Sequence, residues 1–344
     1  IEDDVAEVPL ADPPEWVLVN TEGTGFYRAR YSPDLLSALT RHAHRELSAI
    51  ERYGLIDDAW AAVLAGELHT DDFLRLAEGF GAETDLSVWQ RLIGALYGLD
   101  RLVEGDARAR LQERVRNLVR PALDRLGLSP VDGESDRDRE LRGTLLGALG
   151  VLGDDPDAQT IARDLYAAAS RTPGSVDPSL AAASVTVVAG TGGAAEFEDI
   201  LARYRAAATP QEEQRFLGAL AEFDDAELLE RVLAMTITDD VRTQDAPYLV
   251  RRCLNSRNHG ARAWAFVTGN WDRLNERFPS NSIVRMLEGV RSLSQPEVAD
   301  SVFAFFETHD VPQGDKTLAQ HLERLQVNVG LRRRETPILT AALT

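Results

Sequence analysis

The chain has 344 residues, of which 37 are basic and 56 acidic, so its formal net charge is −19 at pH 7. This charge repels phosphate backbones and argues against nucleic acid as a partner. The length exceeds the roughly 250–300 residues at which a single hydrophobic core stops growing, which predicts two units or one elongated array. Cys253 is the only cysteine, so the chain forms no internal disulfide and no cysteine-rich zinc site.

No apolar run approaches the roughly 20 residues that cross a bilayer, so we expect no membrane partner. The sequence begins at Ile1 without a basic and apolar leader, from which we expect a cytoplasmic chain that is a fragment of a longer protein. Lys316 is the only lysine. Such an arginine bias is typical of GC-rich bacterial coding, and it predicts a bacterial source.

Apolar residues in the first 31 positions have the short spacing of β-strands, at residues 5–10, 16–19 and 26–27, with a glycine turn before the last group. The pattern changes at Ser32 and Pro33. Serine is a favoured helix N-cap, proline is tolerated at the first helical position, and leucines follow at helical spacing. We therefore expect residues 1–31 to be the terminal strands of a β-sandwich domain and residues 32–344 to be an α-helical domain.

The rest of the chain has the helical period, with apolar residues at i, i+3, i+4 and i+7. From about residue 136 the predicted helices come in pairs of roughly 30–40 residues, the size of two-helix solenoid repeats. The predicted fold is mainly α: an α-α superhelix of antiparallel helix pairs of the HEAT or armadillo type, with a short N-terminal β segment. Its expected caps and stops are Asp155, Asp177, Thr209 and Ser294 at helix starts, and Gly127, Gly150 and Gly190 at helix ends.

A search for catalytic constellations yields no catalytic residue and no metal ligand. None of the six histidines lies in an H-E-x-x-H helix. His42 and His44 diverge by about 200° on a helix, so they favour solvated positions over a shared metal. Paired aspartates such as Asp57 and Asp58 favour helix capping over acid–base chemistry. Cys253 lies in an amphipathic segment that predicts a buried, inert thiol.

Residues 184–195 have the appearance of a strand followed by a G-x-G-x-x-A phosphate loop. A dinucleotide site needs a second strand about 20 residues later that ends in an acid. That part of the sequence, residues 204–212, is typical of a helix end and a new cap. We therefore favour a helix that ends in a glycine turn.

Four stretches carry longer motifs: V-L-V-N and G-F-Y-R-A-R-Y within residues 17–31, R-Y-G-L-I-D-D-A-W at 52–60, V-R-T-Q-D, A-W-A-F-V and N-W-D-R-L within 241–274, and V-R-S-L-S at 290–294. In this order they resemble segments of the aminopeptidase N family of zinc metallopeptidases. Val88 and Trp89 match the aromatic position after the second stretch. One position departs from the family: Arg257 stands where an asparagine is usual, three residues before Gly260.

The resemblance implies the C-terminal part of such an enzyme, whose helical domain walls an internal substrate chamber. The family's zinc-binding H-E-x-x-H and exopeptidase G-x-M-E-N motifs are absent from this sequence. We therefore expect no cofactor in this chain, zinc in the missing catalytic domain, and no activity of the chain alone. The expected partners are the catalytic domain of the same polypeptide and a peptide substrate from which N-terminal residues are removed.

The aromatic residues in the matched stretches favour packing over ligand contact. Trp264 and Trp271 are seven residues apart and share a helical face. Tyr27, Trp60 and Trp89 are expected to pack in the same way. Arg28 follows a glycine turn and is expected to brace the N-terminal segment against the first helices.

A chamber wall in a protein of charge −19 needs cations that can hold the C-terminal carboxylate of a peptide. Arg291 is the first candidate for this role, and Gln244 and Arg251 are the second and third. An alternative function is a free-standing helical-repeat scaffold whose concave face binds a protein. A zinc analysis and an aminopeptidase assay separate the two hypotheses.

Overall fold

The computed structural model describes residues 7, 9–311 and 314–344, and all regular elements in these residues are helical, which confirms the mainly α fold. Three short helices, η1 (Thr21–Gly23), η2 (Ala148–Leu152) and η3 (Leu287–Ser292), accompany the α-helices. In chain order the α-helices are α1 (Pro33–Glu46), α2 (Ala49–Ala65), α3 (Thr70–Glu78), α4 (Leu86–Asp100), α5 (Gly105–Leu126), α6 (Asp136–Gly147), α7 (Pro156–Arg171), α8 (Pro178–Thr191), α9 (Ala194–Ala206), α10 (Pro210–Ala219), α11 (Ala226–Thr236), α12 (Ala246–Leu254), α13 (Gly260–Gly269), α14 (Trp271–Arg277), α15 (Ser280–Met286), α16 (Pro296–Phe306) and α17 (Asp315–Leu343).

The strands expected before residue 32 are not formed in the part of the segment that the structure describes, residues 7 and 9–31. A strand needs a neighbour to pair its N–H and C=O groups, and this segment has none. Side chains of α2 hold it instead: Glu51 accepts a hydrogen bond from the Glu22 amide (2.9 Å), and Asp58 accepts one from the Ala29 amide (3.1 Å). Residues 5, 6 and 8 lie outside the described residues. The domain boundary at residue 31 stays a prediction.

Arg28 braces the N-terminal segment as expected, because it pairs with Asp57 and with Asp58 (3.2 Å), both on α2. These two aspartates lie inside α2, so the capping role expected for them is wrong. Tyr27 is 53% exposed, and its expected packing is also wrong. Trp60, Trp89, Trp264 and Trp271 are buried as expected. The rings of Trp264 and Trp271 both have centroids 5.3 Å from that of Phe305.

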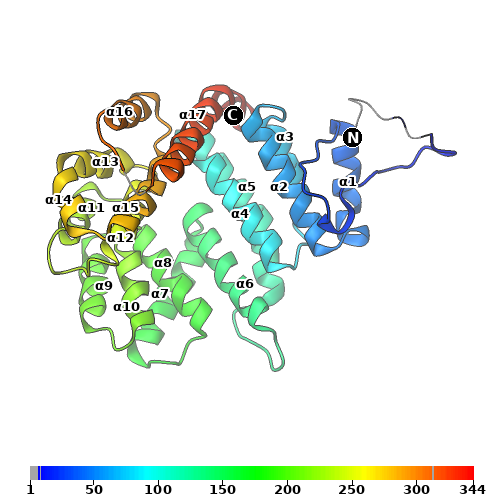
Figure 1. Cartoon of the computed structure of the whole chain (residues 1–344). Helices are drawn as coiled ribbons and strands as arrows, with labels where there is room; N and C mark the ends of the chain where they lie inside the picture. Colours follow the sequence, from blue (N-terminus) through cyan, green and yellow to red (C-terminus); the bar gives the residue numbers. More distant parts are fainter. Residues whose placement is uncertain (1–6, 8, 312–313) are drawn as a thin grey trace.

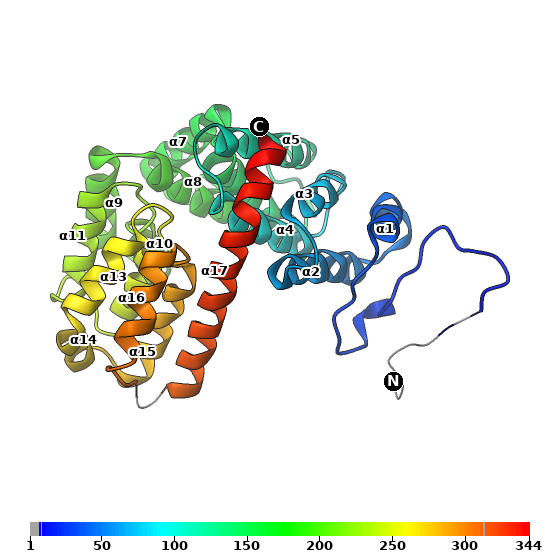
Figure 2. The ribbon, with the colours of Figure 1, turned by 90° about the horizontal axis from the view of Figure 1, so that it is seen from above.

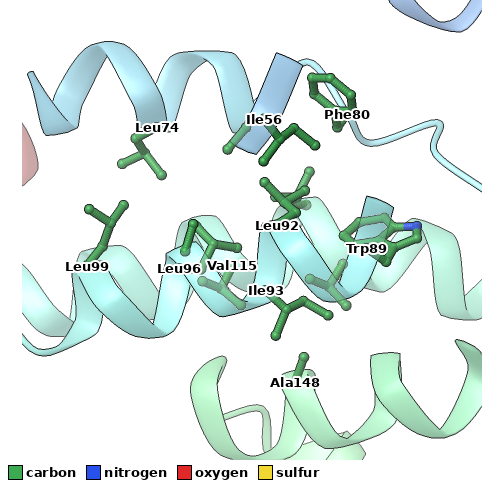
Figure 3. Packing of buried hydrophobic residues seen from close by; sticks show 14 of the residues in the cluster. Ile56, Leu74, Phe80, Trp89, Leu92, Ile93, Leu96, Leu99, Val115 and Ala148 are labelled. Atoms are coloured by element: carbon green, nitrogen blue, oxygen red, sulfur yellow. The ribbon is translucent and has the colours of Figure 1, made fainter. Parts of the chain in front are cut away.

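The helices follow one another around an arch, as Figure 1 shows. Two hydrophobic cores hold it, one between α1 and the start of α8 and the other from the end of α8 onward. Figure 3 shows the first core, in which residues of α4 such as Leu92 and Leu96 lie between Ile56 and Leu74 on one side and Ala148 of η2 on the other. Residues 184–191 lie within α8, which ends before Gly192, so the helix favoured over a phosphate loop is confirmed.

Helix α17 crosses the arch and belongs to both cores (Figure 2). Leu318 and Leu325 in its first half are buried in the second core, whereas Leu331 and Leu339 in its second half are buried in the first. Near its end, the buried Glu335 accepts hydrogen bonds from the amide (3.0 Å) and the hydroxyl (3.2 Å) of Thr70, the first residue of α3. One helix therefore ties together segments of the chain that are about 265 residues apart.

Arginine side chains donate to several main-chain carbonyls at helix ends, which a lysine ammonium group cannot do with the same planar geometry. Arg277 donates to the carbonyl of Thr236, the last residue of α11 (3.2 Å), and to that of Val241 in the loop that follows (3.3 Å). Arg334 donates to the carbonyl of Leu64 in the last turn of α2 (3.0 Å). The free carbonyls of a helix C-terminus carry partial negative charge, and one planar guanidinium can satisfy several of them. The same contact to main-chain carbonyls is made by Arg52, Arg101, Arg116, Arg125, Arg142, Arg257, Arg273 and Arg332.

Most predicted caps form, and the exceptions have visible causes. Asp155, Asp177 and Thr209 accept hydrogen bonds from main-chain amides at the starts of their helices. Ser294 does not cap α16, because its hydroxyl accepts a hydrogen bond from Arg332 of α17 (3.0 Å). Gly150 does not end a helix but lies in the π-helical η2, where a Cβ atom would come within 2.6 Å of Val187.

Replacing Glu335 with alanine is expected to lower the free energy of unfolding by about 1–3 kcal/mol, because it leaves the buried amide and hydroxyl of Thr70 without an acceptor. Urea unfolding followed by circular dichroism measures the change. The matched control is Glu323→Ala, since Glu323 is an exposed carboxylate on the same helix. Equal stability of the two variants would contradict a tie between α17 and α3.

Candidate functional site

The structure brings two of the three predicted site residues together. Glu288 of η3 accepts a hydrogen bond from Arg251 of α12 (2.6 Å), and its other carboxylate oxygen lies 3.6 Å from Arg291 of η3. Gln244 is exposed in the turn before α12 and, within the described chain, makes no side-chain hydrogen bond to this cluster. Arg251 and Arg291 therefore share one counterion, and Gln244 stands apart.

His321 of α17 fixes the direction of Arg291. Its Nδ1 accepts a hydrogen bond from Nε of Arg291 (2.9 Å), and its Nε2 lies 3.0 Å from the Val284 carbonyl, to which it can donate. These partners select the neutral imidazole with the proton on Nε2. Burial, reinforced by the positive charge of Arg291, lowers the pKa of His321 below its ordinary value, against opposing effects of the Val284 carbonyl and Glu288.

The cluster has more cations than anions. Arg324 of α17 faces Arg291 and forms no ion pair with a carboxylate of the described chain, and its burial and the charge of Arg291 lower its pKa. Glu288 is thus the one carboxylate paired with Arg251 and Arg291. Both arginine side chains keep about a third of their surface exposed, 33% and 34%. The cluster can accept a further carboxylate from a ligand.

A cavity of about 600 Å³ lies where α4, η2 and α8 meet the loops before α11 and before α13. Its wall includes Tyr97 and Arg101 from the end of α4, Glu222 from the loop before α11, and Arg257 from the loop before α13. No motif in the sequence singles out the first three of these residues. Glu222 lies more than a hundred positions from Tyr97 and Arg101 in the sequence, and only the closure of the arch places the three residues around one space.

Burial perturbs the acid groups around this cavity. It raises the pKa of Glu222, which the charge of Arg252 offsets only in part. It also raises the pKa of Tyr97, to which Glu222 and Asp100 add. Cys253 behind the wall is fully buried, and burial raises the pKa of its thiol to about 12, which confirms the inert thiol predicted from the sequence.

The described residues contain no group of three or more histidine, cysteine, aspartate or glutamate side chains that could hold a metal ion. His42 lies 3.1 Å from Glu15 and its ring stacks with that of Trp16, whereas His44 packs edge-on against Phe80. The two histidines therefore have different surroundings. Among the helices that the structure describes, none combines the length and the apolar character of a membrane span.

The stability of the chain is expected to fall as the pH drops below about 6.5. His321 has an ordinary pKa of 6.5 and a lower pKa in the folded chain, so the unfolded chain binds more protons in this window. The loss is complete once the pH is below the folded pKa. Urea unfolding between pH 7.5 and pH 5 should show a flatter pH dependence for His321→Gln than for the wild type. His42→Gln is the control, and parallel curves for wild type and His321→Gln would refute the effect.

Comparisons with known proteins agree with this architecture. Residues 16–327 match the family described as ERAP1-like C-terminal domain. The chain is 30% identical over 327 residues to Aminopeptidase M1 of Arabidopsis thaliana, and the match covers 91% of this chain and 36% of that protein. It is 30% identical over 325 residues to Aminopeptidase M1-B of Oryza sativa subsp. japonica, covering 91% and 37% of the two chains.

A yeast protein is similar over the same extent. The Alanine/arginine aminopeptidase of Saccharomyces cerevisiae is 28% identical over 320 residues, which is 91% of this chain and 37% of that protein. The chain thus spans little more than a third of the length of these curated relatives. These relatives come from plants and a yeast, so they give no support to the bacterial source expected from the arginine bias.

Proposed function

The chain belongs to the ERAP1-like C-terminal domain family, and from this premise we propose that it is the C-terminal domain of a zinc-dependent aminopeptidase that removes N-terminal residues from peptides. One observation carries the proposal: the same 91% of the chain matches proteins whose names say aminopeptidase. The chemistry of that enzyme belongs to the part of the relatives that this chain does not span.

Zinc does not fit the residues of this chain. The described part offers no cluster of three or more side chains of the ligand types, and a catalytic zinc site needs three protein ligands. We therefore assign the zinc, and every step of peptide-bond cleavage, to a domain outside this chain. The role of this chain is to enclose and orient the substrate.

The cluster around Glu288 supports that role. Peptides carry a carboxylate at the end opposite to the scissile N-terminal bond, and Arg251 and Arg291 share one carboxylate between them. A second carboxylate at this place would complete the pairing, with Arg324 adding further positive charge. Gln244 is the weakest of the three predicted contacts, because it is exposed in its turn and makes no side-chain hydrogen bond to the cluster in the described chain. The cytoplasmic location stays a prediction.

The 344-residue chain alone is expected to bind no stoichiometric zinc and to release no product from an aminoacyl-anilide, because its described residues contain no fitting ligand cluster. Metal analysis by mass spectrometry and a chromogenic assay measure both quantities. The full-length protein is the positive control and should be active and sensitive to a chelator. Turnover by the chain alone would refute the assignment, and an inactive full-length protein would favour a protein-binding scaffold.

In the full-length protein, Arg291→Ala is expected to raise KM for a long peptide that ends in alanine and to leave KM for a dipeptide unchanged. A lost charge-assisted hydrogen bond costs about 1.5–3 kcal/mol, which corresponds to roughly a 10- to 100-fold change. Initial rates at several substrate concentrations give KM and kcat separately. Arg262→Ala is the control, since Arg262 is an exposed arginine that pairs with Glu230 and not with Glu288. Equal KM values for both peptides would show that Arg291 does not contact substrate.

A further inference from the structure

The cavity at the end of α4 has a charge pattern that the cluster around Glu288 does not have. Its wall carries four carboxylates and four arginines, and most of them are already paired. Asp100 lies 2.8 Å from Arg108 and 3.0 Å from Arg257. Asp224 accepts two hydrogen bonds from Asn258, at 2.9 and 2.7 Å. Asp154 accepts one from Gln159 (2.7 Å), so these acids are satisfied within the chain.

Arg101 is the cation of the cavity that lacks a counterion. Its guanidinium donates to the main-chain carbonyl of Asn255, and no carboxylate in the described ranges forms an ion pair with it. Burial lowers its pKa; the charge of Asp100 opposes this effect, and the charges of Arg257 and Arg332 act in the same direction as burial. A guanidinium in this state is stabilised by any carboxylate that a ligand brings into the cavity.

Glu222 is a carboxylate in the wall of the same cavity, opposite in charge to Arg101. Among the residues that the structure describes, it forms one ion pair, with Arg252 at 3.2 Å. The side chain of Arg252 is 52% exposed, so water weakens this pair. The side chain of Glu222 is itself 39% exposed toward the cavity. Burial raises its pKa, and the charge of Arg252 acts in the opposite direction. A second cation would stabilise it.

Tyr97 lines the same cavity as Arg101 and Glu222 and extends the site. Its side chain is 40% exposed, and it lines both this cavity and a neighbouring cavity of about 530 Å³. The neighbouring cavity is lined mostly by small and apolar residues of α6 and α8, such as Gly143 and Ala182. A tyrosine ring can also hold a cation over its face. The two spaces together are large enough for one charged residue and for the uncharged part of a peptide that precedes it.

We propose that this cavity binds a lysine or arginine residue with a free carboxylate, which Arg101 holds at the carboxylate and Glu222 at the cationic side chain. The ligand is either the free amino acid or the last residue of a peptide. The cluster around Glu288 has only an excess of cations and accepts any carboxylate, whereas this cavity selects the basic side chain as well. The inference rests on the proposed function for its peptide form, but not for its binding chemistry.

Isothermal titration calorimetry on the 344-residue chain tests the binding. The ligand is N-acetyl-glycyl-lysine, and two analogues remove one charge each: the C-terminal amide and the Nε-acetyl-lysine peptide. Each analogue is expected to bind at least roughly 10-fold more weakly, as for the loss of one charge-assisted contact. Free lysine separates the two sources: binding as tight as the peptide indicates an amino acid site, and weaker binding indicates a peptide end.

Two variants test which residue binds the carboxylate of the ligand and which binds its cationic side chain. Glu222→Gln should bind the lysine peptide and its Nε-acetyl analogue equally while it still prefers the acid over the amide. Arg101→Gln should bind the C-terminal acid and its amide equally, while it still prefers the lysine peptide over its Nε-acetyl analogue. Glu198→Gln removes a carboxylate paired with Arg231 (2.7 Å) outside the cavity and should change neither preference. Because Arg101 also holds a main-chain carbonyl, circular dichroism must first show that its variant is folded; the Glu222 variant and the wild-type analogue series decide the question without it.

The proposal is overturned if the wild type binds none of these ligands, or if it binds the two analogues as tightly as the parent peptide. It is also overturned if Glu222→Gln keeps the full preference for the cationic side chain. None of these measurements needs peptidase activity. Their failure therefore leaves the proposed function intact, and an inactive full-length enzyme leaves the binding result intact.

Discussion

The contact of α17 with both hydrophobic cores is the constraint on which the rest of the fold depends. The two cores share only the region of α8 along the chain, so they could rotate against each other there. α17 prevents this because its apolar side chains are buried in both cores and its polar side chains are bonded to both. Glu335 is bonded to the start of α3, and His321 lies 3.0 Å from the Val284 carbonyl of α15. Helix α17 therefore fixes the two halves of the arch relative to each other.

A second tie lies near the middle of the arch, and it starts from the residue that departs from the resembled family. Arg257 donates to the carbonyls of Asp100 (3.2 Å) and Val103 (2.6 Å) and lies 3.1 Å from Glu104. It thus fastens the loop before α13 to the end of α4, across about 154 residues of sequence. An asparagine at this position is too short to reach all three partners. Asp100 and Arg257, which this contact holds together, both line the cavity at the end of α4.

Arginine therefore has a structural function in this protein beyond its charge. The free carbonyls at helix ends need donors, and a chain with many short helices has many such ends. The guanidinium reaches several carbonyls at once and stays charged at every relevant pH. The same residue type supplies the half-buried cations Arg101, Arg291 and Arg324, in a chain whose net charge is −19. A ligand carboxylate would then be repelled by the protein as a whole and attracted at these places.

What the sequence by itself determined is the part of the structure that depends on near neighbours. The helical period, the caps at Asp155 and Asp177, and the shared face of Trp264 and Trp271 are all set within a few turns of one helix. The family resemblance was readable for the same reason, because its motifs are short and contiguous.

Only the tertiary structure decided how distant residues meet. It left the first 31 residues without strands in their described part, because no neighbouring strand is present to pair with them. It turned Ser294 from a cap into an acceptor for Arg332, and it joined Arg251 and Arg291 through Glu288. It also placed Tyr97, Arg101 and Glu222 around one cavity. The spacing of residues along the chain does not predict these long-range contacts, because each contact depends on how the helices pack and on where α17 crosses the arch.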